Sequence, residues 1–127
     1  MRRHRAEAGL TSTELAVVMP VLIALVLVPF QVALWWHAKQ VAVAAAREAV
    51  DAAQVADATD TAGEAAARWF LDAAGNLEEA TVTVTRTVDT VTVEVTGRAP
   101  RLLPGFDWQV TARAVGPVER FVPEPDR

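Results

Sequence analysis

The sequence predicts an α+β fold in which one N-terminal transmembrane helix continues into an alanine-rich helix and packs on a small antiparallel sheet of about three strands. Three observations carry this prediction. A run of 22 residues, Leu15 to Trp36, has no formal charge. An alanine-rich stretch without Gly or Pro follows it, over residues 37–58. Beyond Leu77, valine and threonine alternate, which is the period of a half-buried strand.

The apolar run is long enough to cross a bilayer as a helix. At 1.5 Å per residue it covers roughly 33 Å, against a hydrocarbon core of about 30 Å. Its single polar side chain is Gln31, and Trp35 and Trp36 close it in the manner of an interfacial aromatic belt. A buried core helix is disfavoured because the remaining chain is too small to surround it. A signal peptide, cleaved near Ala42–Ala46, is the minor alternative to a permanent anchor.

The charges that flank this run predict its orientation. Arg2, Arg3 and Arg5 precede it, whereas only His37 and Lys39 follow closely. By the positive-inside rule the N-terminus is cytoplasmic and the C-terminal part lies outside the cell membrane. The predicted segments are a basic leader (1–9), a transmembrane segment (10–36), an extracytoplasmic helical region (37–76), an antiparallel β region (77–116) and a flexible tail (117–127).

The helical region beyond the membrane has local signals for a continuation and a restart. Alanine is the best helix former, so the alanine-rich stretch predicts one rod with the membrane helix. Thr61 and Glu64 have the spacing of a capping box, and Arg68 can pair with Glu64. Gly75 is placed to end this second helix. One apolar stripe is expected along the first part, formed by Val43, Ala46, Val50 and Ala53.

Three runs of alternating residues predict the strands. They are residues 81–88, 91–97 and 108–115, and the first two are joined by Asp89-Thr90 as a hairpin. The apolar side chains expected to face inward are Val82, Val84, Val88, Val91, Val93, Val95, Trp108, Val110, Ala112 and Ala114. This face must be buried, and the alanine-rich helix is the nearest apolar surface.

No constellation for catalysis or cofactor binding is recognisable. The chain has no Cys and no Tyr, and its one serine, Ser12, lies at the membrane edge. His4 and His37 fall on opposite sides of the predicted bilayer, which prevents a Ser-His-Asp arrangement. Nucleotide-binding glycine motifs are absent. We therefore expect no enzyme activity, cofactor, metal, small-molecule substrate or nucleic acid. The acidic residues that fit no calcium loop are Asp51, Asp57, Asp60 and Glu64.

A carboxylate, Glu14, stands immediately before the apolar run and five residues after Gly9. This arrangement resembles the class III leader of type IV pilins and pseudopilins, which a prepilin peptidase cleaves after the glycine. The resemblance implies cleavage between Gly9 and Leu10 and pairing of Glu14 with the new α-amino group of a neighbouring subunit, because an unpaired charge at the membrane is costly. The alternative for Glu14 is a capping box with Thr11 at a helix start.

The stretch GLTSTELAVVMPVL, followed by the alanine-rich AAAREAVDAA, resembles the TadE-like family over Gly9 to Ala53. This resemblance implies a minor pilin or pseudopilin of a tight-adherence (Flp, type IVb) pilus system, similar to pilins in overall shape. The implied partners are the lipid bilayer, other pilin-like subunits, pilus assembly proteins and a prepilin peptidase. The implied location is the cell membrane, with incorporation into the pilus left open.

A second function class stays open. The chain is in this alternative an uncleaved single-pass adaptor, whose outer domain binds another envelope protein by strand addition to its sheet edge. It predicts no cleavage at Gly9 and no role for Glu14.

Overall fold

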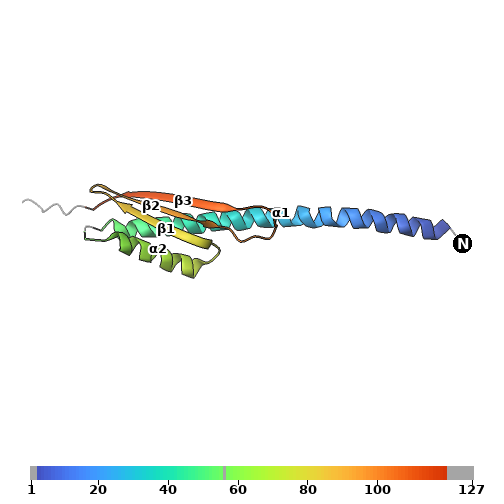
Figure 1. The fold of residues 1–127 in the computed structure, drawn as a ribbon, viewed down its shortest axis with the longest axis horizontal. Helices are drawn as coiled ribbons and strands as arrows, with labels where there is room; N and C mark the ends of the chain where they lie inside the picture. Colours follow the sequence, from blue (N-terminus) through green and yellow to red (C-terminus); the bar gives the residue numbers. More distant parts are fainter. Residues whose placement is uncertain (1–2, 56, 120–127) are drawn as a thin grey trace, which may run out of the picture.

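The computed structural model describes residues 3–55 and 57–119, and these form two helices followed by three strands (Figure 1). The elements are α1 (Arg3–Ala53), α2 (Asp60–Ala74), β1 (Glu78–Arg86), β2 (Thr90–Arg98) and β3 (Gln109–Pro117). The N-terminal half of α1 extends away from all other elements, whereas its C-terminal half lies alongside α2 and the sheet. The predicted α+β fold, with one long apolar N-terminal helix and a three-stranded antiparallel sheet, is confirmed.

Helix α1 is the single rod that the sequence predicts. It passes through Pro20 and Pro29 without interruption, although each proline removes one backbone hydrogen bond. Such prolines are tolerated in apolar membrane-length helices. The helix also begins earlier than its apolar run, at Arg3, so Thr11 lies inside it. The alternative in which Thr11 is the N-cap of a helix start, with Glu14 three residues into the helix, is therefore wrong.

The C-terminal half of α1 buries a stripe of small side chains. Alanine is so short that the helix backbone can approach the sheet and α2 closely. The stripe differs slightly from the predicted one, because Val43 is only half-buried at its margin. Its members recur every three or four residues, as one face of a helix requires: Ala38, Val41, Ala42, Ala45, Ala46, Ala49, Val50 and Ala53.

The valine face of the sheet covers this stripe. The strands pair antiparallel in the order β1-β2-β3, and Val93 in the centre is flanked by Val84 and Ala114. Side chains alternate across a strand, so the threonines on these strands lie on the opposite, outer face. The buried positions match the predicted inward face for Val82, Val84, Val91, Val93, Val95, Val110 and Ala112.

The β1–β2 turn differs from the predicted Asp89-Thr90 turn. Thr90 already belongs to β2, and the three residues Thr87–Asp89 form the connection. The Thr87 hydroxyl accepts a hydrogen bond from the Thr90 N–H at 3.0 Å, and the Thr87 N–H donates to the Thr90 carbonyl at 2.8 Å. Val88 therefore lies beyond the last paired residues, and 79% of it is exposed. Its assignment to the buried face was wrong because alternation has no meaning outside the ladder.

The start of α2 also differs from the predicted capping box. The helix begins at Asp60 with Thr59 as its N-cap, so Thr61 is inside the first turn. The Thr59 and Thr61 hydroxyl groups lie 2.6 Å apart, and Asp60 places a negative charge at the positive end of the helix dipole. The predicted Glu64–Arg68 ion pair is present at 3.8 Å. The predicted stop is present too: the Gly75 N–H donates to the Leu71 carbonyl at 2.9 Å.

Gly63 lies where α2 packs tightly against α1, and this contact gives a stability prediction. A Cβ atom added there lies 2.9 Å from the Ala49 carbonyl oxygen and 3.0 Å from the Ala53 Cβ. We expect Gly63→Val to lower the free energy of unfolding by about 1–3 kcal/mol, because the helices must separate. Ala65→Val, at an exposed position of α2, is the matched control and should cost about 0.5 kcal/mol. Thermal unfolding of the reconstituted protein checks this, and equal shifts for both variants contradict the tight packing.

Candidate assembly surface: the exposed half of the long helix

The N-terminal half of α1 exposes apolar side chains around its whole circumference. From Ser12 to Phe30 every residue is exposed except Leu27, which is half-exposed. Soluble monomers rarely expose a contiguous apolar surface of this size, so lipid or another protein must cover it. In the described part of the chain, α1 is the one helix that is long and apolar enough to cross a membrane. This indicates a single-pass membrane protein.

Glu14 stands at the N-terminal margin of this apolar surface and is exposed. Gly9 and Leu10 lie in the backbone of the same helix. Residues four apart lie on the same helix face, so Leu10 is about 6 Å along the axis from Glu14. A cut after Gly9 would thus create an ammonium group one turn from this carboxylate. The roles of Gly9, Leu10 and Glu14 in cleavage and pairing stay predictions.

Gln31 has a defined structural role that the sequence did not reveal. Among the described residues, Gln31 is the polar residue that is buried in the core, and its exposed fraction is 0%. Its Nε2 donates to the Pro100 carbonyl at 3.1 Å, and its Oε1 accepts from the N–H groups of Leu102 and Leu103 at 2.7 and 3.4 Å. Gln31 therefore fastens the β2–β3 loop to α1 by satisfying both kinds of backbone polar group in it.

The two tryptophans that close the apolar run point to different surroundings. Trp35 is half-buried: its Nε1 donates to the Gln109 carbonyl at 3.2 Å, and the Lys39 ammonium lies 5.6 Å from its ring centroid. Trp36 is 58% exposed. Trp35 thus joins the start of β3 to α1, in addition to its predicted place in an interfacial belt. For Trp36 the membrane-interface role stays a prediction.

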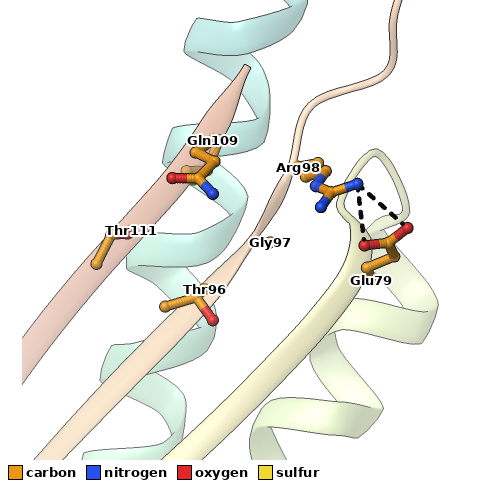
Figure 2. A pocket seen from close by; sticks show the side chains of 7 residues that line it. Glu79, Thr96, Gly97, Arg98, Gln109 and Thr111 are labelled. Carbon is orange, nitrogen blue, oxygen red and sulfur yellow. Dashed lines mark hydrogen bonds and ion pairs between the residues drawn. The ribbon is translucent and has the colours of Figure 1, made fainter. Parts of the chain in front are cut away.

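A shallow hollow with polar lining lies on the outer face of the sheet (Figure 2). Arg98 lies at its rim and pairs with Glu79 at 3.2 Å and with Asp107 at 3.4 Å. The hollow is lined by seven residues, which are Glu79, Thr96, Gly97, Arg98, Gln109, Val110 and Thr111. None of these seven residues provides a nucleophile with a neighbouring base. Across the described residues, no three His, Asp or Glu side chains gather as metal ligands.

The comparisons with known proteins agree with the predicted resemblance. Residues 9–51 match the family described as TadE-like protein. The matched segment begins at the glycine of the leader motif and ends in the alanine-rich part of α1, so the resemblance to the TadE-like family is confirmed over that range. The match covers 43 of the 127 residues. Neither the curated proteins nor the solved structures include a match to this chain.

The sequence singled out Gln31 but did not predict its hydrogen-bond partners in the β2–β3 loop. The available signal was the single amide in an otherwise apolar run, one turn before Trp35. A buried amide needs hydrogen-bond partners. In a helix whose own backbone is paired, the partners must come from another segment. The identity of that segment has no local signature, since the contact spans about 70 residues of sequence.

Proposed function

We propose that the protein is a TadE-like minor pilin or pseudopilin that acts in assembly of a tight-adherence pilus and has no enzyme activity. The observation that carries the proposal is the family match over residues 9–51, because this range contains Gly9, Glu14 and the whole exposed half of α1. Other pilin-like subunits and pilus assembly proteins are the partners in this proposal. The N-terminus is cytoplasmic, and the sheet lies outside.

In this mechanism α1 is the element that binds neighbouring subunits. A prepilin peptidase cuts after Gly9 and leaves Leu10 with a free α-amino group. The apolar helix keeps the protein in the bilayer until neighbouring helices replace lipid around it. Pairing of Glu14 with the ammonium group of a neighbour sets the axial register of the two helices, since both charges lie where water is scarce.

The membrane adaptor remains the second candidate, and the sheet edges favour it. β1 and β3 each pair only with β2 in the described residues, so each has one edge that carries no further strand. An extended segment of another envelope protein could add there by backbone hydrogen bonds. This function needs neither the leader nor Glu14.

The N-terminal sequence of the protein from its native membranes separates the two candidates. We expect the mature chain to start at Leu10, and Gly9→Val to retain the full leader because the peptidase requires the small residue. Intact mass confirms that the remainder of the chain is unchanged. A wild-type chain that starts at Met1 or Arg2 would instead support the uncleaved adaptor. A normally shortened Gly9→Val product would place the cut elsewhere.

A further inference from the structure

The β2–β3 loop, residues 99–108, lies beside the apolar run of α1. Figure 1 shows this loop reaching further along α1 toward the N-terminus than the rest of the sheet. The Gln31 hydrogen bonds to Pro100, Leu102 and Leu103 place it within the run that the sequence assigns to the membrane. Trp35 holds the end of the loop one turn further on, through the Gln109 carbonyl.

The length of the exposed helix brings the bilayer to the level of this loop. From Leu15 to Phe30 an upright helix rises about 24 Å. A hydrocarbon core of about 30 Å that begins at Leu15 therefore extends beyond Phe30, to about Leu34. Gln31 is inside that interval. The loop that Gln31 holds must accordingly lie at the outer edge of the core, where acyl chains meet headgroups.

The side chains of the loop suit that location. Leu102 is 48% exposed and Phe106 is 65% exposed. These are high exposed fractions for large apolar side chains in a loop of a soluble domain. The Phe106 ring also contacts Trp108, with ring centroids 6.3 Å apart. Arg101 is exposed beside Leu102, and a guanidinium is well suited to a lipid phosphate. Apolar tips with a neighbouring cation are the composition expected at a membrane interface.

Several polar backbone groups of the loop are also hydrogen-bonded within the protein, as an environment with little water requires. Irregular backbone at membrane depth is tolerated only where its polar groups are satisfied by protein. Gln31 satisfies one carbonyl and two N–H groups, and the Ala99 N–H donates to the Trp108 carbonyl at 2.9 Å to close the loop. Pro100 and Pro104 have no N–H to satisfy.

We propose that this loop is a second membrane contact of the protein, with Leu102 and Phe106 inserted into the outer leaflet next to α1. We assign lipid as the molecule that covers Leu102 and Phe106, because the loop lies beside the exposed apolar part of α1. The protein then holds the bilayer at two points, a helix that crosses it and a loop that enters one side. The proposal holds whether or not the leader is cleaved.

Depth-dependent quenching tests this proposal. The chain has no cysteine, so Phe106→Cys and Leu102→Cys each give one site for an environment-sensitive fluorophore. The full chain is reconstituted in phosphatidylcholine–phosphatidylglycerol vesicles with or without brominated acyl chains. Val88→Cys is the matched control, because Val88 is an exposed apolar residue in the β1–β2 turn, at the opposite end of the sheet from the β2–β3 loop. We expect several-fold stronger quenching by brominated lipid at 102 and 106 than at 88, and protection of both from aqueous iodide.

Two results would overturn the proposal. Iodide access at 102 and 106 equal to that at 88 means that the loop lies in water. Protection from iodide without quenching by brominated lipid, lost as the protein is diluted in the vesicles, means that a second copy of the chain covers the loop. Two labelled positions are used so that a variant that fails to fold leaves the other to decide.

Discussion

The Glu14→Ala variant is expected to insert into the membrane normally and to be lost from the pilus complex. The apolar run is unchanged, so insertion has no reason to suffer. In the proposed function, assembly then loses the carboxylate that offsets the ammonium group of a neighbour. A charged hydrogen bond of this kind contributes about 1.5–3 kcal/mol, which corresponds to roughly a ten- to hundredfold weaker association. Co-purification of the tagged protein with other pilus subunits, compared at equal membrane levels, measures this.

Glu7→Ala is the matched control for that variant. Glu7 is the other acidic residue before the apolar run. In the proposed function it belongs to the leader that the prepilin peptidase removes. Its loss should leave assembly unchanged. If Glu14→Ala assembles as well as Glu7→Ala does, the pairing role of Glu14 is wrong. Glu14→Gln distinguishes charge from hydrogen bonding, because the amide keeps an acceptor but cannot neutralise an ammonium group.

The Gln31→Leu variant is expected to release the β2–β3 loop from α1. It retains the helix and its apolar character but leaves the Pro100 carbonyl and the Leu102 N–H without their partner. We expect the free energy of local opening to fall by about 2–4 kcal/mol. Trypsin cleavage after Arg101, an exposed site in this loop, should then be at least tenfold faster in reconstituted vesicles, because opening precedes cleavage.

Gln40→Leu provides the control for this experiment. Gln40 is exposed on the same helix and lies beyond the loop. Its replacement makes the same change of chemistry without touching the loop backbone. Equal cleavage rates after Arg101 in the two variants would show that Gln31 does not hold the loop. Cleavage at the other arginines, followed by mass in the same digest, reports whether the domain as a whole has opened.

The parts of the fold that local periodicity controls were predictable. The absence of charge in the apolar run and the alanine-rich stretch after it predicted one rod, and α1 is such a rod. Alternation predicted the inward valines of β2, and Val91, Val93 and Val95 are all buried. These patterns depend on residues close together in sequence, so no knowledge of the rest of the molecule was required.

The parts that failed depend on how one element ends or meets another. Val88 continues the alternation but lies past the last strand pair, which only the register of β1 on β2 determines. Thr61 has the spacing of a cap, yet α2 begins at Asp60 and its N-cap is Thr59. Arg86 is a further case: its guanidinium donates to the carbonyls of Val55 and Ala58, in the connection between the helices.

The candidate site divides in the same way. Gly9, Leu10 and Glu14 were singled out by spacing along one helix, and the family match covers all three. The attachment of the loop to Gln31 and Trp35 could not be inferred, because it joins residues about 70 positions apart. The position of the β2–β3 loop against α1 has no local signature in the sequence.

The continuity of α1 has a mechanical consequence. The same helix that exposes its apolar side chains over residues 12–30 buries one face against the sheet and α2 over residues 38–53, and it is continuous between the two parts. A helix of 51 residues resists bending and twisting over about 76 Å. The rotation of the membrane segment about the α1 axis therefore determines the direction in which the threonine face of the sheet points. If neighbouring helices rotate the membrane segment about its axis, the threonine face of the sheet rotates by the same angle.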